Sequence, residues 1–297
     1  MAERPNIVEY SKTGKLKLPF LKHPGVFPFD VEVNYGAIPE IIDPPYKSTP
    51  FYKISESEFL LHIPGIAGFY VSKGKQIVIS KKAGITENEV FLFLMDSVFS
   101  ALMYQKGLLS FRGMALEKEG KAHVFAGSPG TGKSVLAYEL LKTGKHRLIS
   151  DGHVFSDGRL IYTGFQNITF LQDMINFYDL SSKELTRARP GLNKYWYQPE
   201  KCASESAYPI EALWIMPGVR NETYEIKELK GKEKLKNLWD ATSWKKLAEL
   251  MNRKKDHFGR YVQMANSIPI KNVSFYHSFG KNMDPGKLAS MIEKELD

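Results

Sequence analysis

The chain has 297 residues, of which 43% are hydrophobic and 25% are charged. This composition is typical of a globular protein and excludes global disorder. The length suffices for one large domain or two ordinary ones, each with a sizeable core. The net charge of +8 is compatible with acidic partners such as nucleotides, phosphoproteins, nucleic acid or anionic membrane, but it selects none of them.

Cysteine content and apolar runs limit the class of protein further. Cys202 is the only cysteine, so neither an intrachain disulfide nor a cysteine-based metal cluster is expected. The N-terminus lacks the apolar core of a secretory signal, and no uncharged apolar run approaches the ~20 residues of a membrane span. We therefore expect a cytoplasmic protein without a membrane partner.

The first fifty residues are rich in proline, glycine and lysine. Prolines interrupt the short apolar pieces of this segment at Pro19, Pro24, Pro28, Pro39, Pro44, Pro45 and Pro50. Proline lacks a backbone donor and blocks helix formation. Residues 1–50 are therefore expected to form a loop-rich arm with little regular structure.

Residues 51–105 predict a small α+β domain. Four short β-rich runs follow one another, F-Y-K-I-S, F-L-L-H-I, A-G-F-Y-V-S and K-Q-I-V-I-S. Lys73-Gly74-Lys75 predicts a tight turn between the last two runs. The segment Asn88 to Tyr104 is apolar around most of a helix surface, so this helix is expected to be buried between the small sheet and the domain that follows.

Residues 106–297 predict a second domain that begins with two strands, Leu108 to Leu116 and Ala122 to Ala126. The next residues, G-S-P-G-T-G-K-S, match the pattern G-x-x-x-x-G-K-[ST] of a phosphate-binding loop. Apolar residues then recur near helical spacing up to Gly144, which is a helix stop signal. A strand, a loop and a helix in this order favour a phosphate-binding loop over a chance glycine-rich turn.

This loop predicts a site for nucleotide phosphates, because backbone N–H groups bent around a helix N-terminus supply many donors to an anion. Lys133 is expected to reach the outer phosphates, and the Ser134 hydroxyl to take one Mg²⁺ position. The expected phosphate-binding residues are Gly127, Ser128, Pro129, Gly130, Thr131, Gly132, Lys133, Ser134 and Val135.

Asp151 is the second candidate, because it follows an expected strand over His146 to Ser150, and open α/β sheets bind ligands at the carboxyl ends of their strands. An aspartate there can bind Mg²⁺ or accept the proton of an attacking hydroxyl. A structural Asp-Gly turn or a helix cap is the alternative. His153 lies near enough to merit a test. Asp157-Gly158 predicts a type I′ hairpin turn without chemistry.

Two later segments carry many basic or aromatic residues. Thr186 to Pro190 and Lys194 to Tyr197 could suit a phosphate, a base or a peptide, but packed surface loop is the favoured interpretation. Lys227 to Lys255 predicts a solvated helical region rather than a nucleic-acid stripe. No zinc spacing or RNA-binding signature occurs, so no nucleic-acid partner is expected.

The stretch from Phe111 to Asp151 resembles the catalytic domain of HPr kinase/phosphorylase and of HPr-kinase-like proteins, including those that phosphorylate lasso-peptide precursors. The shared features are a strand, a short turn, the phosphate loop, its helix and a strand that ends in aspartate. A looser likeness covers Phe59 to Leu296. The resemblance implies an α/β fold in which a small α+β domain precedes a P-loop domain with a mixed sheet and helices.

Carried over onto matching positions, the family's roles fall on three residues. Lys133 would neutralise β- and γ-phosphate charge, Ser134 would hold Mg²⁺, and Asp151 would be the general base and a metal ligand. Two positions depart from the family, since Gly152 replaces a second aspartate and Arg112 replaces a histidine. Arginine cannot act as a base, but it can clamp a phosphate or stabilise transferring charge; a structural ion pair is the alternative.

Together, motif and resemblance predict a kinase that uses ATP and Mg²⁺ and transfers the γ-phosphoryl group to a hydroxyl of a small molecule or of a peptide or protein serine. Because of Gly152 and Arg112, the first alternative is a catalytically weak nucleotide-binding regulatory or scaffold protein. An ATPase that drives conformational change is the second alternative, without a recognisable sensor or arginine-finger motif. The resemblance also favours self-association into a homo-oligomer.

Overall fold

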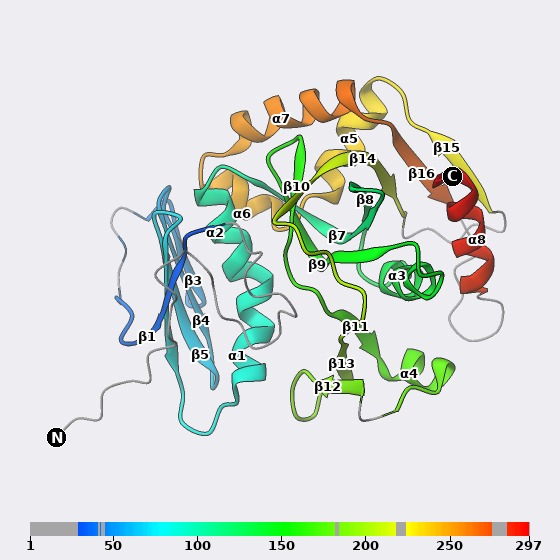
Figure 1. Cartoon of the computed structure of the whole chain (residues 1–297). Helices are drawn as coiled ribbons and strands as arrows, with labels where there is room; N and C mark the ends of the chain where they lie inside the picture. The colour runs from blue at the N-terminus through cyan, green and yellow to red at the C-terminus, as the bar shows by residue number, and fades with distance from the viewer. Residues whose placement is uncertain are drawn as a thin grey trace.

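The computed structural model describes residues 29–40, 42, 45–181, 184–217, 224–274 and 284–296. Most of the arm expected at the N-terminus, residues 1–28, lies outside these ranges. The described chain is a mixed α/β structure with three sheets, of six, seven and three strands. The six-stranded and seven-stranded sheets lie on opposite sides of a long helical segment (Figure 1).

The N-terminal sheet has the strand order β1-β6-β5-β4-β3-β2. Its strands are β1 (Glu32–Tyr35), β2 (Lys47–Ser48), β3 (Tyr52–Ile54), β4 (Glu58–Ile63), β5 (Ala67–Ser72) and β6 (Gln76–Lys81). Only β1 pairs in parallel. The expected turn between β5 and β6 is confirmed, and Lys73 and Gly74 both have positive φ, 52° and 65°.

The proline-rich arm contains more regular structure than predicted. Strands β1 and β2 lie before residue 50, and each pairs with a strand of the N-terminal sheet. The described prolines of this segment, Pro39, Pro45 and Pro50, fall between the strands and not within them, so they remove no donor from the ladder. The sheet therefore draws strands from both sides of the boundary that the composition predicted at residue 50.

The expected buried helix is present as one helical segment with a π turn inside it. It comprises α1 (Glu87–Phe93), the π-helical turn η1 (Leu94–Val98) and α2 (Phe99–Gln105). Thr86 caps α1, and it exchanges hydrogen bonds with Glu89 in a capping box. The segment packs on the N-terminal sheet with Phe69, Phe99 and Leu102 fully buried, and its other side faces the seven-stranded sheet (Figure 1).

The seven-stranded sheet has the order β10-β9-β7-β8-β14-β16-β15, and β10 also pairs with β14. Its strands are β7 (Leu109–Lys118), β8 (Lys121–Ala126), β9 (Arg147–Ser156), β10 (Leu160–Tyr162), β14 (Ala207–Ile215), β15 (Glu225–Glu228) and β16 (Ile270–Ser274). Strands β8, β14 and β16 are parallel neighbours, whereas β7 is antiparallel to both β8 and β9. The sheet is therefore mixed, and the extra pairing of β10 closes one side of it.

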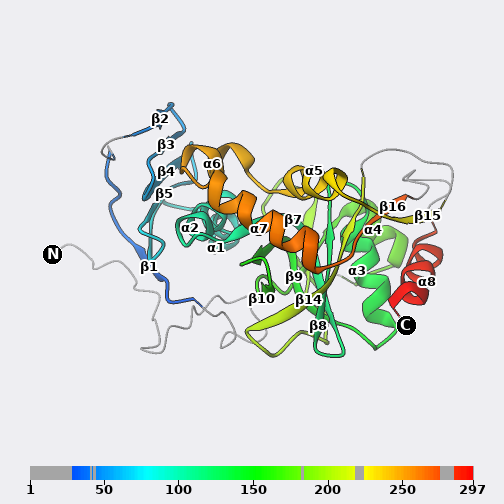
Figure 2. The ribbon, with the colours of Figure 1, turned by 90° about the horizontal axis from the view of Figure 1, so that it is seen from above.

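Helices cover both faces of this sheet. One face packs against α5 (Lys232–Ala241) and α7 (Lys254–Ser267), through residues such as Leu238 and Met264. The opposite face packs against α3 (Lys133–Lys142) and α8 (Pro285–Leu296), through Leu136, Leu140 and Ile292. A short helix, α6 (Lys245–Leu250), joins the first pair to the N-terminal core. Figure 2 shows α7 lying across the strands.

The third sheet corrects the expectation of a surface loop after residue 185. It has the order β11-β13-β12, with strands β11 (Ile168–Leu171), β12 (Leu185–Arg187) and β13 (Lys194–Tyr197), and α4 (Gln172–Tyr178) follows β11. Trp196 is buried and packs on Phe91 and Phe165. Strand β13 carries three consecutive aromatic residues after Lys194, and aromatic residues are enriched in strands.

Two expectations about the stretch after α3 were wrong in detail. Asp151 does not end a strand, because β9 continues through it and pairs with β7 as far as Ser156. The hairpin after β9 is confirmed, but it is not of type I′, since only Gly158 and not Asp157 has positive φ. Instead, the Asp157 carboxylate accepts hydrogen bonds from the backbone N–H groups of Arg159 and Leu160 and forms the turn through its side chain.

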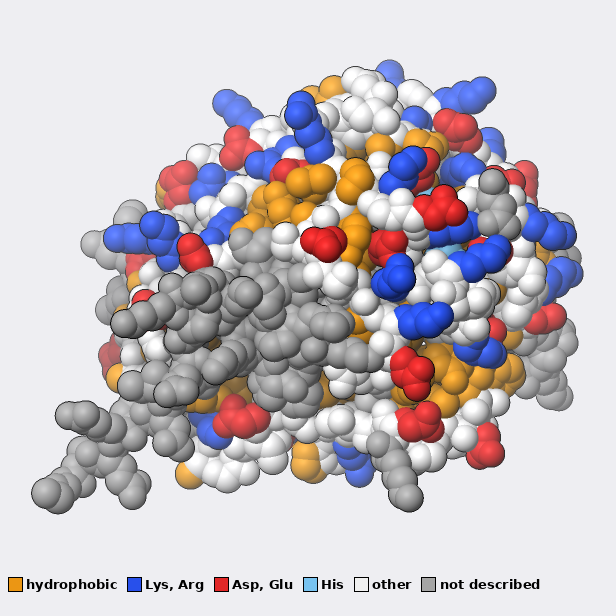
Figure 3. Space-filling model, in the orientation of Figure 1, with side chains coloured by type: hydrophobic (Ala, Val, Ile, Leu, Met, Phe, Trp, Pro, Cys, Tyr) orange, Lys and Arg blue, Asp and Glu red, His pale blue; other side chains and the backbone are white. Residues whose placement is uncertain are grey.

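The surface carries both signs of charge. Figure 3 shows Lys and Arg side chains interspersed with Asp and Glu over one face, without a continuous basic stripe on the described part of that face. Several cations of the described chain pair with carboxylates, as Lys121 does with Glu211 and Lys271 with Glu295. Among the described residues, no helix is both long and apolar enough to cross a bilayer.

Candidate functional site

The glycine-rich loop lies between β8 and α3, as the sequence predicts, and its start is fixed by the neighbouring strands. The N–H of Gly127 donates to the carbonyl oxygen of Arg112 on β7 (3.0 Å), and the N–H of Met216 donates to that of Ala126 (2.8 Å). A Cβ at Gly127 would lie 2.1 Å from the Met216 oxygen, so only glycine fits there. Gly130 and Gly132 both have a φ of +80°, which turns the chain into α3.

Lys133 is buried, with 8% of its surface exposed. Its ammonium group donates to the carbonyl oxygens of Gly127 (2.9 Å) and Ser128 (2.7 Å) and to the Thr131 hydroxyl (2.9 Å). These contacts use all three of its donors. Burial lowers the pKa of Lys133 to about 8. Phosphate oxygens in the loop would compete with the loop's own oxygens for this ammonium group.

Ser134 and Asp151 meet at the start of α3. The Ser134 hydroxyl lies 3.0 Å from Oδ2 and 3.3 Å from Oδ1 of Asp151, and the Thr169 N–H donates to the same Oδ2 (3.0 Å). Asp151 is 4% exposed. Burial raises the pKa of this carboxyl above its ordinary value, against the opposing effect of these hydrogen bonds and of Lys133. Residues 17 positions apart thus form one polar pair beside the loop.

The Ser134 and Asp151 oxygens fit a magnesium ion. Mg²⁺ prefers oxygen ligands and commonly takes only one or two from the protein, with phosphates and water completing the octahedron. A hydroxyl and a carboxylate in contact at a phosphate-binding loop are such a pair. The described residues contain no group of three or more His, Cys, Asp or Glu side chains that could hold a metal alone, so the phosphates would have to supply the remaining ligands.

The loop borders a cavity of about 550 Å³, within the size range of small-molecule sites. The loop, the start of α3 and the middle of β9 form one wall, which includes Lys133, Ser134 and Asp151. Apolar side chains from the α1–η1 segment and from the third sheet form much of the remainder, namely Leu92, Phe93, Met95, Phe170, Leu171, Leu192 and Trp196. The helical segment that packs on the N-terminal sheet therefore lines the same cavity as the phosphate-binding loop.

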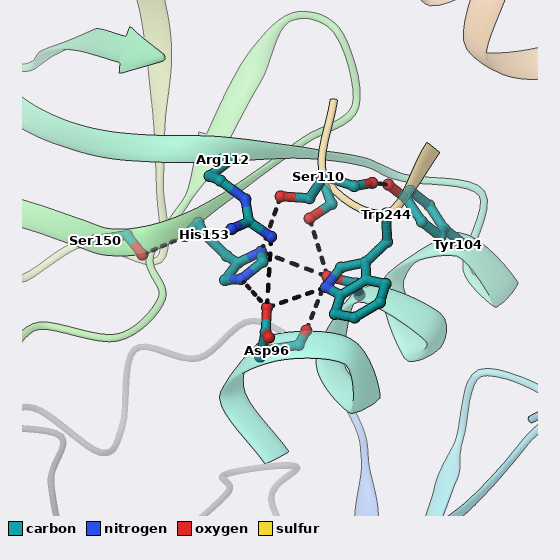
Figure 4. Close-up of polar contacts among 9 residues, drawn as sticks. Asp96, Tyr104, Ser110, Arg112, Ser150, His153 and Trp244 are labelled. Carbon is teal, nitrogen blue, oxygen red and sulfur yellow. Dashed lines mark hydrogen bonds and ion pairs between the residues drawn. The ribbon is translucent and has the colours of Figure 1, made fainter. Parts of the chain in front are cut away.

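Asp96 is a functional candidate that the sequence analysis missed. It lies in η1, lines the cavity, and accepts at one oxygen, Oδ1, from His153 Nε2 (2.8 Å) and Trp244 Nε1 (3.0 Å). Figure 4 shows these side chains converging from separate elements. A signal was present, because Asp96 is the only charged residue from Val90 to Met103, and a lone carboxylate in an apolar helix needs partners.

Arg112, the candidate from β7, faces the same group. It stands opposite His153 in the β7–β9 register, and its guanidinium lies 4.0 Å from Oδ1 of Asp96. The side chain is 37% exposed and lines the cavity. Arg112 therefore forms the ion pair of the structural alternative and also lines the cavity, and its role toward a phosphate stays a prediction.

His153 supports Asp96 with both of its ring nitrogens engaged. A carboxylate only accepts, so Nε2 carries the proton that it shares with Asp96. In the neutral ring Nδ1 then accepts, and the Ser243 hydroxyl lies 3.1 Å from it. Both ring nitrogens of His153 are therefore engaged within the protein, and neither is available to a substrate. We assign His153 the role of orienting the Asp96 carboxylate.

Gly152 shows why no second carboxylate follows Asp151. Its φ is +88°, a conformation that costs an L-residue about 1 kcal/mol or more. A Cβ there would meet no atom within 4 Å, so backbone conformation and not space favours glycine. The positive φ that β9 adopts at position 152 therefore favours glycine over the aspartate that the resemblance implies.

Lys194 is the other residue that sequence reasoning did not assign to the site. It begins β13 and lines the cavity. Burial lowers the pKa of Lys194, whereas the charges of Asp96 and Asp151 oppose that effect. Its ammonium group therefore adds positive charge to the cavity that both carboxylates line. The sequence signal was the basic and aromatic run K-Y-W-Y, which was attributed to packing.

Comparisons with known proteins do not identify a family for this chain. No protein-family model and no curated protein sequence matches the chain. Among solved structures, the HPr(Ser) kinase/phosphatase from Coxiella burnetii is similar over 63% of this chain and 90% of its own length, with 11% sequence identity and a TM-score of 0.30. The function proposed below therefore rests on the contacts within the site.

Proposed function

We propose that the protein is a Mg²⁺- and ATP-dependent phosphotransferase that transfers the γ-phosphoryl group to a hydroxyl of a small molecule or of a peptide or protein serine. The observation that carries this proposal is the contact between the Ser134 hydroxyl and the Asp151 carboxylate, beside Lys133 on a glycine-rich loop that opens into a cavity. Phosphoryl transfer requires mainly positioning and charge neutralisation, and these groups supply both.

Each residue has a defined task in this proposal. The backbone N–H groups of Thr131 to Ser134 bind the phosphates at the N-terminus of α3, where the helix dipole favours negative charge. Lys133 leaves the loop oxygens and binds the outer phosphates, while Arg112 faces the transferring group across the cavity. Ser134 and Asp151 would hold a Mg²⁺ ion, whose charge would offset the negative charge that develops during transfer.

The contacts of Asp151 favour a role at the metal over a role as the general base. Its carboxylate is almost fully buried and is already hydrogen-bonded to Ser134 and Thr169. A base must reach the proton of the acceptor hydroxyl, and a buried carboxylate that faces Ser134 is better placed to hold an ion than to meet an acceptor. The base role carried over from the resemblance therefore becomes the competing assignment.

A catalytically weak nucleotide-binding regulator or scaffold protein is the second candidate. Gly152 favours it, because the strand that carries Asp151 has no second carboxylate at that position. Such a protein would bind ATP through the same loop and would release no ADP. The two candidates thus differ in turnover and not in binding.

One experiment tests binding and turnover together. The full-length protein is incubated with ATP and Mg²⁺, alone and with pooled metabolites and peptides, and ADP release and binding of a fluorescent ATP analogue are followed. Lys133→Ala is compared with Lys142→Ala, which removes a solvent-exposed lysine from the same helix, α3. We expect Lys133→Ala to lower turnover by about 10²–10³-fold, the usual cost of one donor to the transition state, and Lys142→Ala to resemble the wild type.

The possible results separate the candidates. ADP release that rises with the pool and depends on Lys133 supports a phosphotransferase. Nucleotide binding that depends on Lys133 without any ADP release supports the regulatory protein. A wild-type protein that binds no nucleotide would exclude both.

A further inference from the structure

Asp96 is held at one oxygen by three separate parts of the chain. His153 from β9, Trp244 from the start of α6, and Arg112 from β7 all approach Oδ1, at 2.8, 3.0 and 4.0 Å. Within the described residues no hydrogen bond or ion pair reaches Oδ2. The side chain is nevertheless 45% exposed and lines the cavity with the phosphate-binding loop. A carboxylate fixed in this way leaves its second oxygen for a ligand.

We infer that Asp96 is the catalytic residue on the acceptor side, where its Oδ2 binds the acceptor hydroxyl and takes its proton during transfer. This inference rests on the proposed phosphotransferase function. It identifies Asp96 as the group that the helical segment α1–η1–α2 contributes to the reaction. The acceptor is then a neutral hydroxyl that enters between η1 and the phosphate-binding loop.

Irregular backbone at Asp96 and at its hydrogen-bond partner Trp244 supports a functional role. Asp96 lies in a π-helical turn within an otherwise α-helical segment, and such turns occur frequently at functional sites. Trp244 has φ 48° and ψ 42°, a left-handed conformation that is a true outlier for a bulky residue. This conformation costs on the order of 1–3 kcal/mol, and it accompanies the donation from Trp244 Nε1 to Asp96.

Surrounding contacts fix the donors as well. The Ser243 hydroxyl bonds His153 Nδ1 (3.1 Å), the Ser243 N–H donates to the Ser110 carbonyl oxygen (2.7 Å), and the Tyr104 hydroxyl donates to the Ser243 carbonyl oxygen. These bonds connect the turn before α6 to both α2 and β7. Asp96 is therefore preorganised, as general-base catalysis requires.

The charges around Asp96 keep it ionised. Burial raises the pKa of Asp96, but the hydrogen bonds from His153 and Trp244 and the positive charge of Arg112 outweigh this effect, so the pKa lies below its ordinary value. Lys194 is a further cation that lines the cavity, and its charge interacts with that of Asp96. The carboxylate is thus available to accept a hydrogen bond at neutral pH.

The step balances without any further reactant. The acceptor oxygen forms a bond to the γ-phosphorus, and the bond from that phosphorus to the β,γ-bridging oxygen breaks. Its electron pair leaves with ADP, and the proton of the acceptor hydroxyl passes to Oδ2 of Asp96. Proton transfer to a positioned side chain contributes typically about 10²–10⁴-fold to the rate.

Asp96→Asn tests the inference with little change of shape. The asparagine Oδ1 still accepts from His153 and Trp244, whereas the NH₂ group in place of Oδ2 cannot take a proton. The matched control is Asp240→Asn, which removes a carboxylate that is 53% exposed and pairs with Lys245. Asp240 is not among the residues that line the cavity. Both variants are assayed for ADP release with the acceptor pool, ATP affinity and unfolding temperature.

We expect Asp96→Asn to lower kcat about 10²–10⁴-fold while the KM for ATP and the unfolding temperature stay at wild-type values, and Asp240→Asn to change none of them. Wild-type kcat in Asp96→Asn would overturn the inference and leave the proposed function intact. If Asp96→Asn both weakens ATP binding and lowers the unfolding temperature, the inference is also overturned, because Asp96 would then have a structural role. If the wild type itself releases no ADP, the proposed function and the role of Asp96 fail together.

Discussion

Two aspartates border the same cavity, and their surroundings give them different chemistry. Asp151 is 4% exposed, and burial raises its pKa. Asp96 is half exposed, and although burial raises its pKa, the hydrogen bonds from His153 and Trp244 and the charge of Arg112 hold that pKa below the ordinary value. Pairs of titratable groups whose environments separate their pKa values mark distinct roles in a reaction. We assign the buried carboxylate to the metal and the exposed one to the acceptor.

Asp151→Asn separates the metal role from the base role. Asparagine keeps the hydrogen-bonding shape but loses the charge that holds a cation, so the Mg²⁺ concentration for half-maximal ADP release should rise by about 10- to 100-fold, as when the surroundings of other protein metal sites are altered. A titration of ADP release against Mg²⁺, with Asp240→Asn as control, measures this shift. An unchanged Mg²⁺ requirement with turnover lost at every concentration would instead make Asp151 the base.

At the scale of elements, the β7–β9 ladder brings the site together. Its register places Arg112 opposite His153 and Met114 opposite Asp151, with Gly113 and Gly152 between them. Because side chains on a strand alternate between faces, Arg112 and Met114 share one face, and His153 and Asp151 share the same face on the neighbouring strand. The ladder therefore places the site candidates of two strands on one face of the sheet.

Gly113→Ala should destabilise this ladder. A Cβ at Gly113 would lie 2.4 Å from the carbonyl oxygen of Phe125 on β8, and such overpacking against backbone costs about 1–3 kcal/mol. The control is Gly259→Ala in α7, where a Cβ meets nothing within 4 Å and helix propensity predicts a gain of about 0.5–1 kcal/mol. Urea denaturation measures both changes; a Gly113→Ala protein as stable as the wild type would contradict the packing shown by the structure.

The elements near the loop could be predicted because their signals are local. The run Ala122 to Ala126, the glycines and the apolar spacing after Lys133 define a strand, a loop and a helix without help from distant residues. The end of β9 was wrongly predicted at Asp151, since Asp-Gly favours a turn but pairing with β7 keeps the strand extended. The KYWY segment was wrongly taken as a loop for the same reason, because its strand partners lie elsewhere in the sequence.

At the scale of the whole molecule, the cavity exists only where the N-terminal unit meets the second one. The contact between Asp96 and Trp244 joins residues 148 positions apart, and no local pattern predicts such a pair. The sequence therefore indicated the phosphate side of the site, which lies on one strand, loop and helix, and missed the acceptor side. Because Gly152 stands where the resemblance implies a second aspartate, the sequence suggested that the site lacks one carboxylate. In the structure Asp96 of η1 brings a second carboxylate to the cavity.

Buried histidines make the stability of the whole fold depend on pH. His257 is fully buried between Tyr104 and Tyr261, and burial lowers its pKa to about 4. In the unfolded chain the histidine pKa is about 6.5, so between these values the unfolded state binds more protons. The free energy of unfolding is therefore highest above pH 6.5 and falls as the pH is lowered toward 4. His257 accounts for up to about 3 kcal/mol of this decrease.

His257→Phe tests this dependence, because phenylalanine keeps a ring in the aromatic cluster and cannot be protonated. We expect the free energy of unfolding of the variant to fall less steeply than that of the wild type between pH 6.5 and 4. Urea denaturation at several pH values gives both slopes. Equal slopes would show that His257 is protonated in the native state and that its burial carries no such cost.

The central claim, transfer of phosphoryl to a hydroxyl other than water, is tested most directly by measuring ADP and inorganic phosphate in one reaction. Wild-type protein is incubated with Mg²⁺ and ATP labelled at the γ-phosphorus, together with the pooled metabolites and peptides, beside Lys133→Ala. We predict ADP in excess of inorganic phosphate, with the missing label on an acceptor, and no such excess in Lys133→Ala. Equal amounts of ADP and inorganic phosphate, or ATP bound without release of either, would contradict the claim.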